Sequence, residues 1–103
     1  MQDKEQEPKY RCPICGYFGL DEADPNSGTL QFLGFYEICP CCGAEFGSDI
    51  DADSIDELKQ SIYRYRMKWI NEGHNWFSDY DGPPIDWDWK RELREIGIDV
   101  DDI

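Results

Sequence analysis

The residues best suited to chemistry in this sequence are its cysteines. Four of the five follow the spacing Cys-x2-Cys-x23-Cys-x2-Cys, and each pair lies in a similar unit, Cys-Pro-x-Cys-Gly. A turn of this kind points two sulfurs at one centre, and its glycine frees backbone N–H groups to hydrogen-bond to them. We therefore predict one metal ion held tetrahedrally by four thiolates: Cys12, Cys15, Cys39 and Cys42.

The ligand set accepts zinc and iron alike, so the metal is expected to be zinc, with iron as the alternative. Four sulfurs would fill every coordination position and leave none for water or substrate, which argues against a hydrolytic enzyme. Structural zinc contributes an apparent ~10 to 16 kcal/mol near neutral pH. A small domain has a net stability of roughly 5 to 15 kcal/mol, so the metal would be essential to the fold.

The fifth cysteine, Cys41, aligns with Ile14 when the two turns are superimposed, and Ile14 is not at a ligand position. We interpret Cys41 as a small packing residue. The alternative is a substitute ligand or a redox-sensing thiol, although no Lys, Arg or His lies nearby in sequence to lower its pKa. Paired Cys-x-x-Cys motifs with an odd cysteine favour metal binding in a reducing compartment over disulfides.

The elements that must position the cysteines begin with a predicted hairpin. Residues 23–28 are dense in turn formers, and residues 29–38 are rich in β-branched and aromatic residues. We expect a hairpin whose two strands each carry one half of the site, with a bulge or bend at Gly34.

Two helices should follow an acidic connector. The first is expected from a capping box at Ser54 and Glu57 to about Glu72, ending at Gly73, with one apolar stripe. The stripe comprises Ile55, Leu58, Ile62, Tyr65 and Trp69. The second is expected from about residue 87 to 96, with Asp86 as its cap and Gly97 beyond its end.

The fold class predicted is therefore small α+β: a β-hairpin with two cysteine turns, packed against two C-terminal helices. We expect one compact domain in which residues 1–8 are a disordered lead-in, residues 9–48 form a zinc ribbon, and residues 49–103 are a helical extension packed on that ribbon.

Ten Lys and Arg residues against 23 Asp and Glu residues give a net charge of −13. Such a charge repels nucleic acids and anionic membranes and favours fast capture of a basic protein. No apolar stretch approaches the length of a membrane helix, and the N-terminus is polar rather than a signal sequence. A cytoplasmic protein without a membrane partner is expected.

Other candidate sites are weaker. Asp49, Asp51 and Asp53 begin like a calcium loop, but Ser54 stands where the loop requires glycine, so a solvated connector is the better interpretation. His74 is expected to have a capping or surface role. The cations Lys59, Arg64, Arg66 and Lys68 are expected to stabilise the helix dipole and to pair with the acidic half of the chain.

Aromatic residues are dense near the C-terminus: Trp69, Trp76, Phe77, Trp87 and Trp89. Most are expected in the core. Any that were exposed together would suit a protein partner.

Two families share these motifs. Residues 10–17 (YRCPICGY) and 39–44 (CPCCGA) resemble the iron-binding loops of rubredoxins, which are small electron carriers. The likeness covers about forty residues; the spacer is shorter than in typical rubredoxins, and some fifty further residues follow.

Residues 36–43 (YEICPCCG), 45–47 (EFG), 69–73 (WINEG) and 76–77 (WF) are similar to the bacterial cysteine-rich CPCC-type zinc-ribbon proteins over most of the chain. That resemblance implies a rubredoxin-like ribbon with packed helices and says little about activity.

The function expected from these observations is a non-enzymatic, zinc-stabilised adaptor or immunity protein that binds a basic protein partner, with no catalytic residues. The first alternative is a rubredoxin-like iron electron carrier, and the second is a nucleic-acid-binding zinc ribbon, which the charge makes the weakest.

Overall fold

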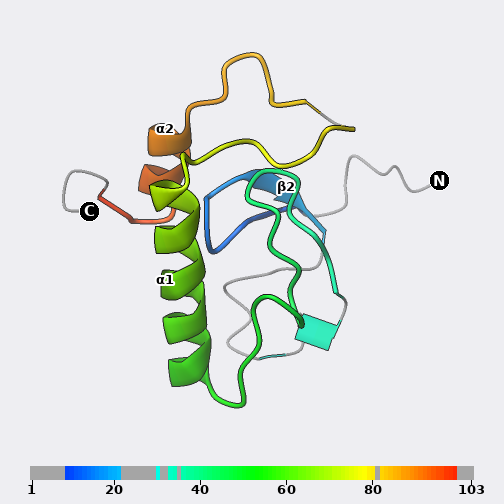
Figure 1. Ribbon diagram of the computed structural model, residues 1–103, viewed down its shortest axis with the longest axis vertical. Coiled ribbons are helices and arrows are strands. Elements are labelled where there is room, and N and C mark those ends of the chain that lie inside the picture. Colours follow the sequence, from blue (N-terminus) through cyan, green and yellow to red (C-terminus); the bar gives the residue numbers. More distant parts are fainter. Residues whose placement is uncertain (1–8, 22–29, 31–32, 35, 81, 100–103) are drawn as a thin grey trace.

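The computed structural model describes residues 9–21, 30, 33–34, 36–80 and 82–99, so the lead-in predicted for residues 1–8 lies outside the described part. The elements in chain order are β1 (Tyr10–Arg11), β2 (Phe18–Leu20), α1 (Ile55–Asn71) and α2 (Trp89–Glu95). In Figure 1, α1 forms one side of the molecule, with the short hairpin and the loops beside it. The predicted α+β class with a hairpin and two helices is confirmed.

The hairpin is smaller than predicted and encloses only the first cysteine pair. β1 and β2 are antiparallel, with Tyr10 opposite Leu20 and Arg11 opposite Phe18. Around the second pair, an isolated antiparallel bridge joins Ile38 to Glu45. The expectation of one cysteine pair on each strand of a single hairpin is therefore wrong for the described residues.

The reason is that each cysteine turn reverses the chain by itself. The N–H of Cys12 donates to the carbonyl of Tyr17 at 2.8 Å, and the N–H of Cys39 donates to that of Ala44 at 3.0 Å. Pairing is thus completed locally on either side of each turn. Within the predicted second strand, Leu33 and Gly34 lie in a 3₁₀ turn, so the chain bends at Gly34 as one of the two alternatives expected, but it does not do so within a strand.

Helix α1 confirms the predicted start and stop signals. The Ser54 hydroxyl accepts from the Glu57 N–H at 3.2 Å, and the Glu57 carboxylate accepts from the Asp53 N–H at 2.9 Å. At the other end, Gly73 has a left-handed φ of 112°. The N–H groups of Gly73 and His74 close the last turn onto the carbonyls of Ile70 and Trp69, which is a Schellman motif.

Helix α2 starts later than predicted. Its cap is Asp88, whose carboxylate accepts from the Lys90 N–H at 3.0 Å, rather than Asp86. Trp87 belongs to the preceding turn, because its N–H donates to the Pro84 carbonyl at 3.0 Å. Gly97 lies beyond the helix end as predicted, with a φ of 82°.

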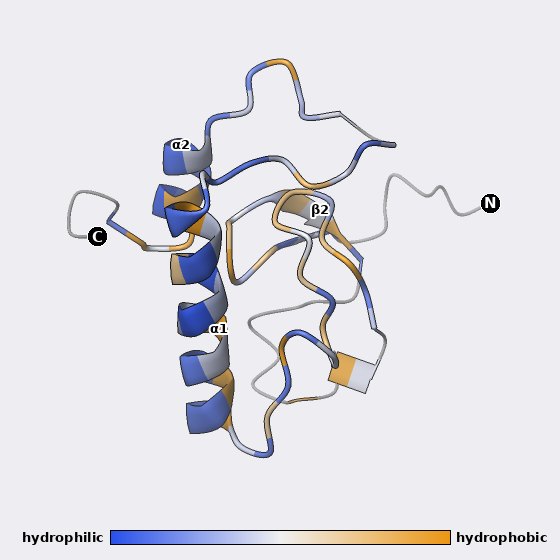
Figure 2. Cartoon of the chain, in the orientation of Figure 1, coloured by the Kyte–Doolittle hydropathy of each residue, from blue (hydrophilic) through white to orange (hydrophobic). Residues whose placement is uncertain are grey.

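The core lies between the cysteine turns and one face of α1. Figure 2 shows hydrophilic residues along the outer side of α1 and hydrophobic ones toward the loops. Leu58 and Trp69 of the predicted stripe are buried, whereas Ile55 is 39% exposed. Most of the fully buried residues come from the two cysteine turns and the segments beside them: Cys12, Ile14, Cys15, Leu20, Cys39, Cys41, Ala44, Phe46 and Ile50; Leu93 of α2 is also fully buried.

The tryptophans pack mainly against one another and the core, as expected. Trp69 is buried, while Trp76, Trp87 and Trp89 are partly buried. Edge-to-face contacts join Trp69 to Trp89 at 6.5 Å and Trp76 to Trp87 at 5.5 Å between ring centroids. Phe77 is the exception, with 58% of its surface exposed.

In the part of the chain that the structure describes, no helix has the length and apolar character needed to cross a membrane.

Candidate metal centre

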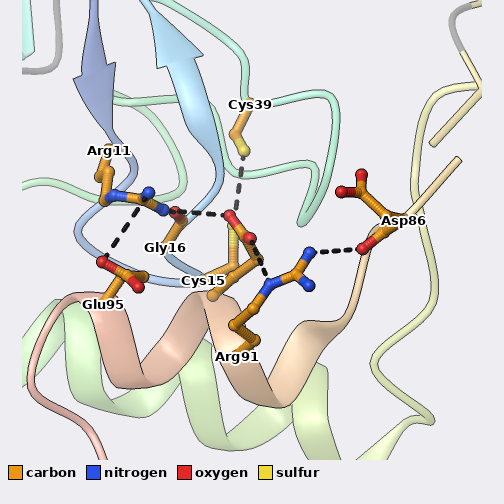
Figure 3. Close-up of polar contacts among 8 residues, drawn as sticks. Arg11, Cys15, Gly16, Cys39, Asp86, Arg91 and Glu95 are labelled. Carbon is orange, nitrogen blue, oxygen red and sulfur yellow. Dashed lines mark hydrogen bonds and ion pairs between the residues drawn. The ribbon is translucent and has the colours of Figure 1, made fainter. Parts of the chain in front are cut away.

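The four predicted ligands come together in one buried cluster. The sulfurs of Cys12, Cys15, Cys39 and Cys42 all lie within 4.8 Å of one another. None of the four residues is more than 4% exposed. The closest sulfur pairs join the two turns: Cys12 to Cys42 at 3.8 Å and Cys15 to Cys39 at 3.7 Å. Figure 3 shows the Cys15 and Cys39 side chains pointing toward each other.

These separations fit a tetrahedral metal site. With metal–sulfur bonds of about 2.3 Å, the sulfur–sulfur edges of a tetrahedron are about 3.8 Å. The two closest pairs, at 3.7 and 3.8 Å, have this length. A disulfide would bring two sulfurs to about 2.05 Å, and all five cysteines are free. The donor set is thus chemically and geometrically suited to a thiophilic cation.

Each turn is held by the same backbone pattern. The N–H of Gly16 donates to the Cys12 carbonyl at 2.9 Å, and the N–H of Gly43 donates to the Cys39 carbonyl at 2.8 Å. Both glycines have left-handed φ angles, 87° and 79°. The repeated Cys-Pro-x-Cys-Gly unit therefore forms the same loop twice, because its last position requires a backbone conformation that only glycine adopts readily.

Helix α1 supports the first turn through Arg66, which is only 9% exposed. Its Nε donates to the Ile14 carbonyl at 2.8 Å, and its Nη2 donates to the Pro13 carbonyl at 2.9 Å. The planar guanidinium thus satisfies two carbonyls of one tight loop, which a lysine could not do in the same geometry.

The Arg66 contact also reaches a ligand sulfur through one amide group. The Pro13 carbonyl that accepts from Arg66 belongs to the same peptide unit as the Ile14 N–H, and that N–H donates to the Cys12 sulfur at 3.4 Å. A cation on the oxygen polarises the amide and strengthens the N–H as a donor. Arg66 is therefore linked to a ligand sulfur through a single peptide group.

The second turn is supported by different groups. The N–H of Phe77 donates to the Cys41 carbonyl at 3.0 Å, and that of Ser78 donates to the Pro40 carbonyl at 2.9 Å. Pro40 and Cys41 occupy the positions in the second turn that Pro13 and Ile14 occupy in the first. In addition, the Tyr65 hydroxyl donates to the Cys42 carbonyl at 3.1 Å.

A second arginine ties the first turn to α2 (Figure 3). Nη1 of Arg11 donates to the Gly16 carbonyl at 2.9 Å and to the Glu92 carboxylate at 3.1 Å. The other carboxylate oxygen of Glu92 lies 3.8 Å from Nε of Arg91. Glu92 thus bridges two guanidinium groups beside the turn, and Arg91 also donates to the Asp86 carbonyl.

The environment of the thiols shows why a cation suits this cluster. Burial, followed by hydrogen bonds from the neighbouring thiols, raises the pKa of Cys15 and Cys42 well above the ordinary value. Burial acts in the same direction on Cys39, but hydrogen bonds from the other thiols outweigh it, and the pKa of Cys39 is lowered. One thiolate can therefore be accommodated by its neighbours, whereas four require a cation to balance their charge.

The remaining sequence candidates fall outside this centre. Cys41 is fully buried but lies outside the group of four, which agrees with a packing role. Asp49 and Asp51 accept backbone N–H groups of Glu45 and Ala52, and among the described residues the four cysteines are the metal-binding group found. His74 stacks on Trp89, with ring centroids 3.9 Å apart. Lys59, Arg64 and Lys68 are exposed on α1.

Arg66 is the contributor that the sequence interpretation missed. It was assigned to the helix dipole and to pairing with carboxylates, but it binds the first cysteine turn. A signal was present, since Arg66 falls between Ile62 and Trp69 at the spacing of the apolar stripe. A cation on a buried helix face must find acceptors there.

Among the known proteins that the chain resembles are two from Bacillus subtilis. The chain is 38% identical over 72 residues to the protein named "Uncharacterized protein YoaQ" from Bacillus subtilis (strain 168), covering 62% of this chain and 59% of the relative. It is 36% identical over 72 residues to "Uncharacterized protein YozI" from the same organism, with the same coverage. The chain thus spans about 59% of the length of these relatives. No protein-family model matches it, and no solved structure does.

Proposed function

We propose that this chain is a zinc-stabilised, non-enzymatic protein that binds a basic protein partner as an adaptor or immunity protein. The observation that carries the metal assignment is the cluster of four buried sulfurs within 4.8 Å of one another. It is supported by the closest sulfur pairs, which have the edge length of a tetrahedral thiolate site.

The proposal assigns the metal a structural role. With all four vertices of the tetrahedron supplied by cysteine, no coordination position is open to water or substrate. The ribbon in this proposal is rubredoxin-like, and the chain is grouped with the CPCC-type zinc-ribbon proteins on the motifs described above. A reducing, cytoplasmic setting would keep the thiols available for the metal.

A binding role is supported by charge and by exposed apolar residues. The net charge of −13 favours fast, salt-sensitive capture of a basic surface. Phe77, Tyr80 and Ile85, in the segment that connects α1 to α2, are 58%, 95% and 106% exposed. Aromatic side chains such as those of Phe77 and Tyr80 are frequent anchors of a protein interface.

The metal assignment is tested by elemental analysis and an absorption spectrum of protein purified from its own host. The expected result is one equivalent of zinc in colourless protein, with loss of the helical circular dichroism when a strong chelator removes the metal. Protein that folds without any metal would overturn the proposal.

The binding role is tested with a hexa-arginine peptide as the basic probe and duplex DNA as the anionic comparison. We expect hexa-arginine to bind with an affinity that falls as salt rises, and DNA not to bind. If hexa-arginine fails to bind at low salt, the basic-partner part of the proposal is wrong.

A rubredoxin-like iron electron carrier is the second candidate, and one observation favours it. Cys42, the least buried of the four ligands at 4% exposure, lines an open pocket of about 330 Å³, so one ligand residue lies near the surface. Red protein that contains iron and is bleached reversibly by a mild reductant would establish this function in place of the first.

A further inference from the structure

Half of the residues that line the pocket beside the metal centre are aromatic. It has a volume of about 330 Å³ and lies between the C-terminal half of α1 and the segment that follows it. Tyr65, Trp76 and Phe77 contribute rings to it, and Phe77 is the most exposed of them at 58%. The backbone of Phe77 is fixed because its N–H donates to the Cys41 carbonyl, and its ring lies over Gly43. A pre-formed aromatic surface of this kind is suited to binding.

The charges around this pocket favour a cation. Cys42 lines the pocket, and four thiolates with one divalent metal ion would carry a net charge of −2. Glu72 adds a carboxylate on the wall. Aromatic faces attract cations through their negative quadrupole, and the attraction grows when the site is partly desolvated.

One cation of the chain already lies here. The ammonium of Lys68 is 6.0 Å from the centroid of the Tyr65 ring, and Lys68 also lines the pocket. This lysine occupies one aromatic face and repels a second cation. It therefore competes with any cationic ligand, and its removal should strengthen binding rather than weaken it.

We infer that this pocket receives an arginine side chain of the partner, stacked on Phe77 and paired with Glu72. Arginine fits better than lysine because its planar guanidinium stacks on an aromatic ring and is less strongly hydrated. The inference rests on the proposed function, since it identifies where the basic partner is recognised.

The probe is N-acetyl-arginine methylamide, titrated into the full-length, metal-loaded, ¹⁵N-labelled chain at physiological salt. We expect saturable NMR shifts centred on the Phe77 amide and the Trp76 indole N–H. The neutral isostere N-acetyl-citrulline methylamide should bind at least about threefold more weakly. Equal binding of the two compounds, or shifts spread evenly over the acidic surface, would overturn the inference.

Three variants test the pocket: two are expected to weaken arginine binding and one to strengthen it. Phe77→Ala and Glu72→Gln should each weaken arginine binding roughly threefold or more, while Lys68→Gln should strengthen it roughly twofold to threefold. Phe18 is the matched control, because it is 54% exposed but lies outside this pocket, so Phe18→Ala should leave the affinity unchanged. Metal content, measured on each variant, verifies that the site remains loaded. If Lys68→Gln weakens binding, or if Phe18→Ala matches Phe77→Ala, the pocket is not the site.

The same variants separate this inference from the proposed function. If hexa-arginine binds all variants equally and with strong salt dependence, the pocket is not the recognition site. The proposal of an acidic protein that captures basic partners would then still stand. If hexa-arginine does not bind the natural sequence at all, the proposal of a basic partner is wrong.

Discussion

The two cysteine turns share one backbone conformation but are supported by different chemistry. Around the first, the carbonyls of Pro13 and Ile14 accept from the charged side chain of Arg66. Around the second, the matching carbonyls of Pro40 and Cys41 accept from two neutral backbone N–H groups. A repeated motif therefore determines the conformation of its own loop and not the groups that surround it. Both turns accept hydrogen bonds from the C-terminal half of the chain. The donor is the Arg66 side chain at the first turn, and the donors are the N–H groups of Phe77 and Ser78 at the second.

The largest predicted effect should be the same for both turns. Cys15→Ser and Cys42→Ser each remove one sulfur from the cluster, so either should abolish stoichiometric metal binding and with it most of an apparent ~10 kcal/mol of folding energy. Cys41→Ser, in the same buried loop but outside the group of four, should keep one equivalent of metal. Metal analysis and circular dichroism on the three proteins measure this. A Cys41→Ser protein without metal would contradict the ligand assignment.

The next effect should be confined to the first turn. Arg66→Met leaves the Pro13 and Ile14 carbonyls without their donor, and each lost partner of a buried group costs roughly 1 to 3 kcal/mol. We therefore expect the free energy of unfolding of the metal-loaded protein to fall by roughly 2 to 6 kcal/mol in urea denaturation. Arg66→Lys keeps the charge but not the paired donors and should recover only part of this loss. Full recovery would mean that charge alone matters.

A third test compares the two glycines. A Cβ at Gly16 would collide with the backbone carbonyl of Glu92 in α2, whereas one at Gly43 would lie 2.5 Å from the side chain of Phe77. Both substitutions strain a left-handed residue by about 1 kcal/mol. Phe77 is largely exposed and can rotate, while a helix backbone cannot. Gly16→Ala should therefore lower the unfolding free energy by about 1 to 2 kcal/mol more than Gly43→Ala. Equal losses of unfolding free energy in the two variants would show that the backbone of α2 moves aside as easily as the Phe77 side chain.

The smallest effect concerns Tyr65, which supports the second turn. Tyr65→Phe removes the hydrogen bond to the Cys42 carbonyl and should cost about 1 kcal/mol. Burial, aided by the negative charge of Cys42, raises the pKa of Tyr65 from 10.0 to about 12. Because the folded state holds this proton more tightly than the unfolded state, the contribution is complete below pH 10 and is lost as the pH rises toward 12. Stability curves of the two proteins should converge over that range; parallel curves would contradict the assignment.

The sequence predicts the local structure well because its signals are local. The cysteine spacing, the capping pair Ser54 and Glu57, and the stop at Gly73 each act within a few residues, and the structure contains all three features. The predicted hairpin is too large, because backbone pairing around each cysteine turn joins only the segments that flank that same turn. The predicted start of α2 is wrong because Asp86 and Asp88 are equally suitable caps in sequence, and the structure uses Asp88.

The partners of the two turns could not be predicted in the same way. Arg66 is 52 residues from Ile14, and Phe77 is 36 residues from Cys41, so no short pattern connects them. Side-chain type helped only for Arg66, which interrupts the apolar stripe of α1. The donors to the second turn are backbone groups, and those carry no signature in residue type.

The pairing of sulfurs across the two turns has a consequence for the order of assembly. Each Cys-x-x-Cys loop closes on itself within five residues, so either one can capture an ion at two points while the rest of the chain is still unfolded. Completing the coordination then requires only that the other loop diffuse into contact, a closure of a few tens of residues. We therefore expect the ion to bring the two loops together before α1 docks on them.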